Sequence, residues 1–412
     1  MKKFFAIALV LVMIFALAAC GGNSTNNDTE SNNETESANN GNEETTLKFG
    51  FIYLHDQNST YDRNFMEGAK AACEKLGVEY IEKVPIPEGN ECYEAAIDLV
   101  NQGCSLIFAD SFGHEEFLLT AAEEHPEVEF CHATGTMAHT ENLANFHNAF
   151  ASIYEGRYLA GIAAGMKLNE MIAAGEFKAE EAKIGYVGAY TYAEVISGYT
   201  SFFLGARSVC PTATMEVQFT GSWYDETAEK NAAETLISRG CKLISQHADS
   251  MGAPTACEDA GVPDISYNGS TVEACPNTFI VSSRINWEPY FEYVIGCVKE
   301  GKAIDTDWTG TIATGSVVLT DVNEKAAAAG TVEAIAEAKA KLEAGELEVF
   351  DTDKFTVNGE KVTTYLADVD TDAAFTGDTE VIENGAFKES KFRSAPYFDL
   401  AIDGIERLNA IY

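Results

Sequence analysis

The stretch AIDLVNQGCSLIF, residues 96–108, returns in altered form as AETLISRGCKLIS at residues 233–245. Each copy has the pattern of an amphipathic helix end, a Gly-Cys turn and the start of an apolar strand. The first strand leads to Asp110-Ser111 and the second to Asp249-Ser250. The chain therefore contains an internal repeat, and the repeat sets its organisation.

Strand-like stretches also precede both copies, at residues 47–54 and 182–190, and candidate helices follow them at 62–76 and 192–209. Each half of the chain thus alternates strand, helix, strand, helix, strand. Such alternation predicts parallel sheets with right-handed crossovers. We expect an α/β fold made of two doubly wound parallel-sheet lobes, with a hinge and a ligand cleft between them.

Ligands of open parallel sheets meet the loops at the carboxyl ends of the strands. The sequence places four such loops at residues 55–62, 110–114, 190–194 and 246–250. Two lobes that face each other would bring all four loops around one cleft. This arrangement suits a binding protein that closes on its ligand. The loops supply the candidate ligand-binding residues Tyr61, Asp62, Ser111, Phe112, Gly113, Tyr190, Glu194, Gln246, Asp249 and Ser250.

Two of the three tryptophans, Trp223 and Trp287, follow apparent strands. With Phe112 and Tyr61 they would line a flat aromatic slot, in which each stacked ring face contributes about 1–3 kcal/mol, as for nucleic-acid bases. Polar groups at the edge of the slot would then set specificity. Simpler roles stay open, because lone tryptophans are usually core residues and Phe112 is equally suited to a core lid.

Two further alternatives concern the first and third loops. Ser59 or Thr60 would cap a helix, with Asp62 complementing its dipole, and need not contact a ligand. One of Tyr190 and Tyr192 is expected to be structural. On the strand before Asp249, alternation favours a core position for His247, away from Gln246 and the ligand.

Residues 244–252, ISQHADSMG, contain the residue types of a hydrolytic triad or a metal site. The nucleophile pattern G-x-S-x-G is absent, however, and neighbours on one short loop rarely converge on one point. A second candidate set, His125, His132, His139 and His147, shows neither HExxH nor a helical i, i+4 pair. A stretch at 368–380 lacks the glycine and glutamate spacing of a calcium loop. We predict no catalytic residue, no metal and no cofactor.

The N-terminal residues 1–20 have two lysines, a short apolar run and a final cysteine, which together indicate a secretion signal. The end of this stretch, LAAC, resembles a bacterial lipobox with Cys20 as the lipidated residue; an ordinary cleavable signal is the alternative. Residues 21–46 are polar throughout and read as a disordered tether. We expect attachment to the cell membrane through lipid at Cys20, on the extracytoplasmic face.

The formal net charge of the chain is −38 at pH 7. Such a surface repels nucleic-acid phosphates and anionic lipid headgroups, so we expect no nucleic-acid partner and a membrane contact through the lipid alone. Nine of the ten cysteines remain besides Cys20, with no C-x-x-C pair. This argues against a metal knuckle or a complete disulfide framework and leaves one or two disulfides possible.

An ordered series of motifs resembles the basic membrane protein family. They are SFG (111–113), HATG (132–135), YEGRYLAGIAAG (154–165), GARSVCP (205–211), SWYD (222–225), QHADS (246–250) and NWEPYF (286–291). Members of that family are lipoprotein substrate-binding components of bacterial ABC importers with a type I periplasmic-binding-protein fold. The resemblance runs from about residue 47 to 320 and implies a small-molecule ligand, permease and ATPase partners, no turnover and a monomer.

The resemblance divides the chain into a first part of lobe 1 at 47–150, lobe 2 at 151–275 and a return to lobe 1 at 276–323. The tail, 324–412, matches the family poorly. We expect it to form a helix and a solvated acidic β-appendage whose lobe is open, with VNGE at 357–360 as a hairpin turn.

Within the family, purine nucleoside receptors hold the ribose with an aspartate and a lysine, whose places are taken here by Asn268 and Asn286. The SWYD, QHADS and NWEPYF motifs resemble instead a branch associated with free purine bases such as adenine. Asp249, Ser250, Asn268 and Asn286 would pair with the polar edge of the base. The resemblance thus implies a purine nucleobase, with a nucleoside (adenosine, inosine or guanosine) as the alternative. A surface receptor that presents its ligand to a signalling protein shares the fold and is a third possibility.

Overall fold

The computed structural model describes residues 47–369 and 376–412. The predicted secretion signal, Cys20 and the tether lie outside the described residues. Within the described ranges, no helix has both the length and the apolar character that a membrane crossing needs. All nine cysteines that these ranges contain are buried and free of disulfides.

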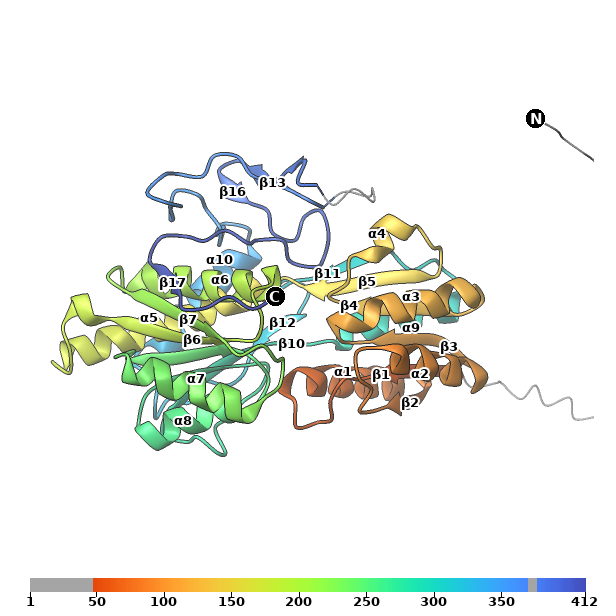
Figure 1. The fold of residues 1–412 in the computed structure, drawn as a ribbon, viewed down its shortest axis with the longest axis horizontal. Helices are drawn as coiled ribbons and strands as arrows, with labels where there is room; N and C mark the ends of the chain where they lie inside the picture. Colours follow the sequence, from red (N-terminus) through yellow and green to blue (C-terminus); the bar gives the residue numbers. More distant parts are fainter. Residues whose placement is uncertain (1–46, 370–375) are drawn as a thin grey trace, which may run out of the picture. The chain divides into compact units, whose positions relative to one another are not determined.

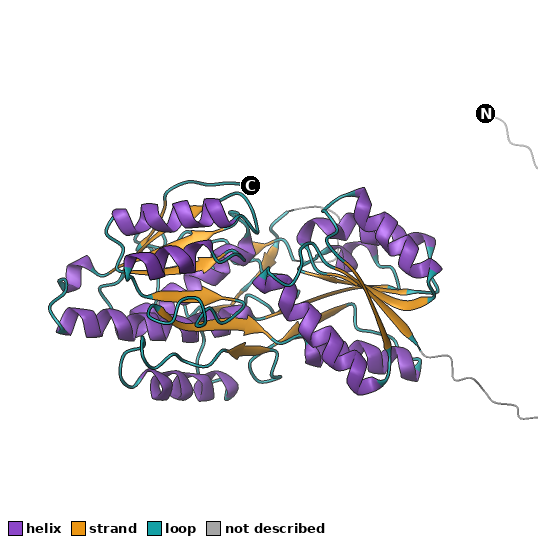
Figure 2. Ribbon diagram, turned by 90° about the horizontal axis from the view of Figure 1, so that it is seen from below, coloured by secondary structure: helices purple, strands orange, loops and turns teal. Residues whose placement is uncertain are grey.

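The first lobe is built on a six-stranded sheet whose neighbouring strands are all parallel. In spatial order its strands are β11 (Asp307–Gly310), β5 (Phe146–Ala151), β4 (Glu129–Ala133), β3 (Cys104–Ala109), β1 (Lys48–Ile52) and β2 (Glu79–Lys83). Its helices are α1 (Thr60–Leu76), α2 (Asn90–Asn101), the short η1 (Phe112–His114), α3 (Glu115–Glu124), α4 (Met137–Glu141) and α9 (Glu288–Glu300). Helix α1 packs against α9 and α2 against α3, and Figure 2 shows helices on both faces of the sheets.

The second lobe has a seven-stranded sheet that is parallel except for β12. In spatial order the strands are β12 (Val317–Leu319), β10 (Phe279–Ile285), β9 (Asp264–Tyr267), β8 (Leu243–His247), β6 (Lys183–Gly188), β7 (Thr214–Phe219) and β17 (Ile405–Arg407). Its helices are α5 (Ile153–Ala173), the short η2 (Ala179–Glu181), α6 (Ala193–Val209), α7 (Glu226–Ser238) and α8 (Gly252–Ala260). Figure 1 shows the elements of both lobes.

The internal repeat is visible in the strand orders of the two sheets. The first lobe has the order β5-β4-β3-β1-β2 and the second has β10-β9-β8-β6-β7, so corresponding strands follow one topology. The two repeated sequences form α2 with β3 and α7 with β8. The predicted α/β class with two parallel-sheet lobes is confirmed.

The chain passes between the lobes three times, between β5 and α5, between β10 and α9, and between β11 and β12. The sequence suggested that the whole segment 276–323 returns to the first lobe. This expectation is wrong, because only part of the segment does so. Strands β10 and β12 belong to the second sheet, whereas α9 and β11 belong to the first lobe. Strand β10 is buried almost throughout, and pairing on both sides, with β9 and β12, satisfies its backbone there.

Close helix packing in the second lobe explains the small residues of YEGRYLAGIAAG and GARSVCP. A Cβ atom on Gly161 of α5 would lie 2.0 Å from the carbonyl oxygen of Phe202 in α6. A Cβ atom on Gly205 of α6 would lie equally close, 2.0 Å, to the carbonyl oxygen of Tyr158. Only glycine at these two positions lets the helix backbones approach so closely.

The C-terminal segment begins with α10 (Thr331–Glu343), which packs on α5. It continues through β13 (Leu366–Ala367), β14 (Thr379–Glu380), β15 (Ile382–Glu383) and β16 (Ala386–Phe387) before β17. The turn at 357–360 is confirmed, with Asn358 and Gly359 at φ 53° and 79° and one bridge between Val357 and Glu360. The calcium-loop comparison at 368–380 falls partly on residues 370–375, outside the described residues.

The expectation of a solvated appendage is wrong. The segment has a buried aromatic cluster, in which the rings of Phe350 and Phe398 stack with centroids 4.3 Å apart. Phe355, Phe387 and Tyr397 are also buried in this segment. Strand β17 pairs in parallel with β7 and so extends the second sheet. Most acidic residues of the segment lie at its surface, whereas the aromatic residues between them form a core.

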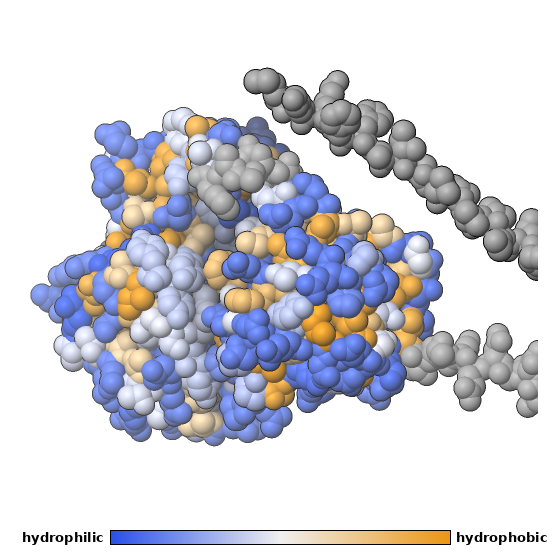
Figure 3. Space-filling model, turned by 45° about the vertical axis from the view of Figure 1, so that its right-hand side comes forward, coloured by the Kyte–Doolittle hydropathy of each residue, from blue (hydrophilic) through white to orange (hydrophobic). Residues whose placement is uncertain are grey.

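The surface of the molecule is polar over much of one face. Figure 3 shows hydrophilic residues over this face, with hydrophobic residues scattered among them.

Candidate ligand-binding cleft

A cavity of about 380 Å³, part of it open to solvent, lies where the strand ends of both lobes meet. The first lobe and the second lobe both contribute walls, as expected for loops at the carboxyl ends of parallel strands. The twelve lining residues are Leu54, His55, Tyr61, Asp62, Ser111, Phe112, Thr134, Glu194, Trp223, His247, Asp249 and Tyr267.

Half of the fourteen candidate ligand-binding residues line this cavity. Their contact with a ligand remains a prediction, but the fold brings them together from distant parts of the chain. They are Tyr61, Asp62, Ser111, Phe112, Glu194, Trp223 and Asp249.

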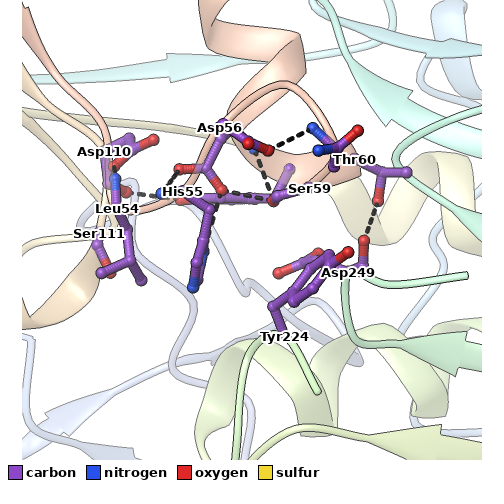
Figure 4. Close-up of polar contacts among 12 residues, drawn as sticks. Leu54, His55, Asp56, Ser59, Thr60, Asp110, Ser111, Tyr224 and Asp249 are labelled. Atoms are coloured by element: carbon purple, nitrogen blue, oxygen red, sulfur yellow. Dashed lines mark hydrogen bonds and ion pairs between the residues drawn. The ribbon is translucent and has the colours of Figure 1, made fainter. Parts of the chain in front are cut away.

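Carboxyl groups anchor the first lobe's side of the cavity, as Figure 4 shows. Asp62 accepts hydrogen bonds from the backbone N–H of His55 (2.7 Å) and the hydroxyl of Ser59 (2.5 Å). Asp110 accepts one from the backbone N–H of Leu54 (3.1 Å). Burial, and next the negative charge of Asp62, raise the pKa of Asp110 well above its ordinary value. These contacts fix the end of β1, which carries Leu54 and His55 into the cavity wall.

Helix α1 starts at this point, so the capping alternative for Ser59 holds. Its hydroxyl accepts a hydrogen bond from the backbone N–H of Asp62 (3.3 Å). The same helix start places Tyr61 in the wall, where its hydroxyl donates to the carbonyl oxygen of Asp110 (2.8 Å). Asp62 therefore serves the first turn of the helix and lines the cavity as well.

Asp249 occupies the second lobe's side and joins the two lobes. Its carbonyl oxygen accepts hydrogen bonds from the backbone N–H and the hydroxyl of Thr60, both 3.2 Å. Its side chain accepts one from the amide of Asn268 (3.2 Å). Burial, followed by the nearby Glu229 and Asp62, raises the pKa of Asp249 well above its ordinary value. The two lobes are therefore in direct contact beside the cavity.

Asn268 does not line the cavity, although it was predicted to contact the ligand. It adopts the left-handed conformation (φ 62°), which asparagine tolerates. Its carbonyl oxygen accepts a hydrogen bond from the amide of Asn64 in α1 (2.9 Å). Asn268 thus orients Asp249 and links the second lobe to the first.

Aromatic side chains meet across the cleft. Phe112 of the first lobe is 48% exposed and lies 5.6 Å, between ring centroids, from Tyr192 of the second. Its exposure at the cavity wall excludes the core-lid alternative. Tyr190 stacks on Tyr192 (5.1 Å) and meets the ring of Trp223 edge-on (5.2 Å). Tyr190 therefore contacts Trp223 but does not line the cavity itself.

The prediction that Trp287 lines the aromatic slot is wrong. Its side chain is 1% exposed and stacks on Phe65 of α1, with ring centroids 4.3 Å apart. Gly68 of α1 makes room for it, since a Cβ there would lie 2.9 Å from the Cβ of Trp287. Trp287 follows a crossover back into the first lobe and fills the core between α1 and α9.

The assignment of Gln246 and His247 is reversed. His247 lines the cavity and contacts the ring of Tyr267 (centroids 4.1 Å apart), while its Nε2 lies 3.5 Å from Glu194. Burial lowers the pKa of His247, and Glu194 opposes this shift. The amide of Gln246 instead donates to the carbonyl oxygens of Ala248 (2.7 Å) and Ser250 (3.2 Å), which shapes the turn.

Three more predicted residues, Ser250, Gly113 and Asn286, do not line the cavity. The backbone N–H of Ser250 donates to Glu229 (3.2 Å), and its hydroxyl accepts from the N–H of Gly252 at the start of α8 (3.1 Å). The N–H of Gly113 donates to Glu88 (2.9 Å). Asn286 belongs to the crossover, where its amide donates to the carbonyl oxygen of Gly315 (3.2 Å).

Sequence reasoning missed Leu54, His55, Thr134 and Tyr267. Thr134 and Tyr267 lie at the ends of β4 and β9, two strands whose loops were not counted among the four. Thr134 has φ 66°, unusual for a β-branched residue. The hydroxyl of Tyr267 is buried and has no hydrogen-bond partner within the described part of the chain. It is therefore available to a ligand that reaches it.

The lining favours ligands with hydrogen-bond donors and a flat ring. Asp62, Glu194 and Asp249 contribute carboxyl groups, and none of the twelve lining residues is a lysine or an arginine. Tyr61, Phe112, Trp223 and Tyr267 add aromatic surface. In residues 47–369 and 376–412, no three His, Cys, Asp or Glu side chains are grouped so that they could hold a metal ion.

The family model described as "ABC transporter substrate-binding protein PnrA-like" (Bmp) matches residues 54–351. The chain belongs to the Bmp family. This confirms the resemblance found in the motifs. The family consists of substrate-binding proteins of ABC transporters, so the protein is an extracytoplasmic, non-enzymatic component that works with permease partners. Residues 352–412 lie beyond the match.

Two curated relatives have nearly the same sequence identity to this chain. One, named purine-binding protein BAB2_0673, from Brucella abortus, is 32% identical over 60% of this chain and 67% of its own. The other, named putative ABC transporter glucose-binding protein TsgA13, from Haloferax volcanii, is 31% identical over 63% of this chain. The match spans 61% of the Haloferax protein, less than two thirds of its length.

A solved structure of an ABC transporter solute-binding protein from Conexibacter woesei has a similar fold. Its TM-score is 0.59 at 19% identity, over 74% of this chain and 98% of that one. At this identity the likeness concerns the fold alone, which is that of a two-lobed solute-binding protein.

Proposed function

We propose that the protein captures a purine nucleobase, adenine in the first instance, and delivers it to the permease and ATPase of an importer. The observation that carries this proposal is the lining of the cavity, which combines aromatic faces with three carboxyl groups and contains neither lysine nor arginine. The name of the Brucella relative, a purine-binding protein, supports the same ligand class.

The chemistry of adenine fits this lining. Its ring would stack on Phe112 and Trp223, each contact stabilising the complex by about 1–3 kcal/mol. Its N–H groups would donate to the carboxyl oxygens of Asp249 or Asp62, and each such hydrogen bond would contribute about 0.5–1.5 kcal/mol. The unpartnered hydroxyl of Tyr267 would serve a ring nitrogen. A purine carrying a negative charge would be repelled by the carboxyl groups.

A purine nucleoside is the second candidate, because a larger cavity adjoins the first and offers room beyond the base. Isothermal titration with adenine, hypoxanthine, adenosine, inosine and glucose separates these ligands. We expect adenine to bind at micromolar concentration or below. Tight binding of nucleosides without any binding of bases would reverse the order, and binding of glucose alone would overturn the proposal.

We also propose lipid attachment at Cys20, on the sequence evidence alone. Cells expressing the full chain should retain the protein in the membrane fraction, and Cys20→Ser should release it or leave an unprocessed precursor. Mass spectrometry of the N-terminal peptide measures the lipid directly. Retention of the Cys20→Ser protein in processed form would exclude this anchor.

A further inference from the structure

A positive charge is buried behind the wall of the ligand-binding cavity. Arg157 of α5 is 0% exposed and does not line the cavity. Within residues 47–369 and 376–412, every hydrogen-bond acceptor of its guanidinium group is a neutral oxygen. The acceptors are the carbonyl oxygens of Ser266 (3.2 Å) and Gln246 (3.4 Å) and the hydroxyls of Ser283 (3.3 Å), Tyr186 (3.0 Å) and Ser245 (2.6 Å). Dipoles, and not an ion pair, therefore hold this charge.

The position of this charge indicates a role beyond packing. A buried cation without an ion pair costs several kcal/mol, and apolar side chains would fill the same core at lower cost. Burial raises the pKa of the neighbouring Asp264 to about 7, so its carboxyl group balances the charge only in part. The guanidinium group instead lies over the rings of Tyr186, Phe202 and Tyr267, at 5.4, 4.8 and 5.3 Å from their centroids. Tyr267 is a residue of the cavity wall.

The hydroxyl of Tyr186 connects Arg157 with the cavity. A guanidinium group can only donate hydrogen bonds, so the oxygen of Tyr186 accepts from Arg157 (3.0 Å). The proton of the hydroxyl is then available to Nδ1 of His247, 3.4 Å away. Receiving this proton requires a lone pair on Nδ1. Nδ1 is therefore the acceptor nitrogen of His247.

The other nitrogen of His247 lies next to a second residue of the cavity wall. Nε2 is 3.5 Å from Oε1 of Glu194. With Nδ1 as the acceptor, a neutral imidazole carries its proton on Nε2. Burial lowers the pKa of His247; Glu194 opposes this shift, whereas the charge of Arg157 adds to it. The neutral ring thus places an N–H donor beside a carboxyl group.

Close packing holds the ring of His247 in this orientation. Its side chain is 2% exposed. Helix α6 is so near that a Cβ atom on Gly198 would lie 2.3 Å from Nδ1 of His247. The centroid of the Tyr267 ring is 4.1 Å from that of the imidazole. Because the ring has little room to turn, its two nitrogens stay where these hydrogen bonds place them.

We propose that Arg157 and Tyr186 are positioning residues for the ligand, because they fix His247 as the neutral tautomer with its proton on Nε2. His247 then presents a donor next to the acceptor Glu194. The hydroxyl of Tyr267, which has no partner among the described residues, adds a second donor. A flat ligand with an acceptor next to a donor, such as a ring nitrogen beside an amino group, matches this edge of the cavity. The inference rests on the proposed function, in which the cavity holds adenine.

NMR of the ligand-free protein labelled with ¹⁵N-histidine tests the tautomer directly. The two neutral tautomers and the imidazolium differ in their nitrogen shifts and in their couplings to the ring protons. The signal of His247 is the one that His247→Gln removes. We expect the Nε2–H tautomer in the wild type at pH 7. Tyr186→Phe removes the donor to Nδ1, and Arg157→Gln offers the Tyr186 hydroxyl an amide oxygen instead. In both variants a signal of the Nδ1–H tautomer should appear.

Isothermal titration with adenine measures the consequence for the ligand. Tyr186→Phe should weaken binding about fivefold to tenfold, as expected for one misplaced donor. His247→Gln keeps an N–H donor near the position of Nε2 and should bind adenine within about threefold of the wild type. His247→Asn places its amide near the position of Nδ1 and should bind about tenfold more weakly. In the His247→Asn background, Tyr186→Phe should have no further effect on affinity.

Tyr199→Phe is the matched control. Tyr199 is 1% exposed and meets the ring of Tyr186 edge-on (5.8 Å), but its hydroxyl accepts from Nε of Arg407 (2.7 Å). Its substitution should lower stability and leave both the tautomer of His247 and the adenine affinity unchanged. An equal loss of affinity in Tyr199→Phe would show a purely structural effect and overturn the inference.

The inference is also overturned by an Nδ1–H or charged ring of His247 in the wild type, or by a tautomer that Tyr186→Phe leaves unchanged. If Arg157→Gln does not fold, Tyr186→Phe decides alone. The NMR result does not depend on the ligand. The expected tautomer in a protein that binds no purine would support the positioning of His247 and overturn the proposed function.

Discussion

The two lobes carry the same Asp-Ser pair at the end of the repeated strand and use it in opposite ways. In the first lobe Ser111 lines the cavity, whereas Asp110 lies beneath it and holds the end of β1. In the second lobe Asp249 lines the cavity, whereas Ser250 is turned toward α7 and α8. An internal repeat thus locates the loops of a site but does not tell which of two neighbouring side chains enters it.

A glutamate accepts hydrogen bonds from the turn that carries the Asp-Ser pair in each lobe, but the groups that donate to it differ between the lobes. Glu88 accepts hydrogen bonds from the hydroxyl of Ser111 (2.6 Å) and the N–H of Gly113 (2.9 Å) in the first lobe. Glu229 accepts from the N–H of Ser250 (3.2 Å) and the N–H of Asp225 (3.1 Å) in the second. Burial raises the pKa of Glu229 to about 7. The second turn therefore depends on a buried titratable group.

The largest expected effect concerns the two tryptophans that follow strands, Trp223 and Trp287. Trp287→Ala should lower the free energy of unfolding by about 3–5 kcal/mol, because it empties a core position. Trp223→Ala should instead weaken adenine binding by about tenfold to a hundredfold, equivalent to the loss of one stacked ring. Urea denaturation and isothermal titration of both variants make the comparison. Loss of affinity without loss of stability in Trp287→Ala would contradict its core placement.

The next effect is the pH dependence of stability contributed by Glu229. The pKa of Glu229 rises from 4.5 to about 7 on folding. Between pH 4.5 and pH 7, the folded state therefore keeps a proton on Glu229 that the unfolded state has lost. Its contribution is most favourable below pH 4.5 and declines as the pH rises through 7, by on the order of 1–3 kcal/mol. Glu229→Gln should remove this part of the decline.

Urea denaturation at pH 5 and pH 8 measures the decline in the wild type and in Glu229→Gln. The variant also loses an acceptor, at a cost that does not depend on pH, so only the difference between the two pH values is informative. Glu88→Gln, at the other turn, is the matched control and should leave the wild-type difference in place. Identical pH profiles for all three proteins would exclude this role of Glu229.

The aspartates of the two turns provide the third test. Asp249→Asn should weaken adenine binding about tenfold, because it replaces one acceptor oxygen of the cavity wall by an amide N–H₂ group that cannot accept a hydrogen bond. Asp110→Asn should change affinity less than threefold, since burial raises the pKa of Asp110 and an asparagine resembles its neutral form. Isothermal titration between pH 5 and 8 adds a second readout. Because burial raises the pKa of Asp249, its carboxyl group loses the proton at a higher pH than an ordinary aspartate; adenine affinity should rise as that proton is lost, and Asp249→Asn should lack this rise.

The fold could be predicted from the sequence because repeated patterns determine it. The copies at 96–108 and 233–245 identified two parallel sheets, and the strand-end rule placed Tyr61, Phe112 and Asp249 around one cleft. The division of 276–323 could not be predicted, because the apolar strand Phe279–Ile285 could pair within either sheet. Which sheet it joins depends on packing over the whole lobe.

Side-chain direction limited the prediction of the site. His247 and Asp249 are two residues apart and line the cavity together, as alternation along an extended backbone requires. The sequence analysis took Gln246 as the ligand contact, and the same alternation then placed the side chain of His247 in the core, which is wrong. Taking Asp249 as the cavity residue instead predicts that His247, two residues earlier, also lines the cavity. The Trp287 error had another cause, since the close approach of α1 and α9 at Gly68 leaves no trace in the local sequence pattern.

The smallest expected effect separates the serines of the two turns. Ser250→Ala should lower the free energy of unfolding by about 0.5–1.5 kcal/mol, because its hydroxyl accepts the N–H of Gly252 at the start of α8. Adenine affinity should stay unchanged. Ser111→Ala should reduce affinity about threefold, because Ser111 lines the cavity, and should also lower the free energy of unfolding by about 0.5–1.5 kcal/mol, because its hydroxyl donates to Glu88. Thermal denaturation and titration of the pair measure both quantities. Equal effects of the two substitutions on affinity would mean that the turns are used alike, and the difference between Asp110 and Asp249 would then need another explanation.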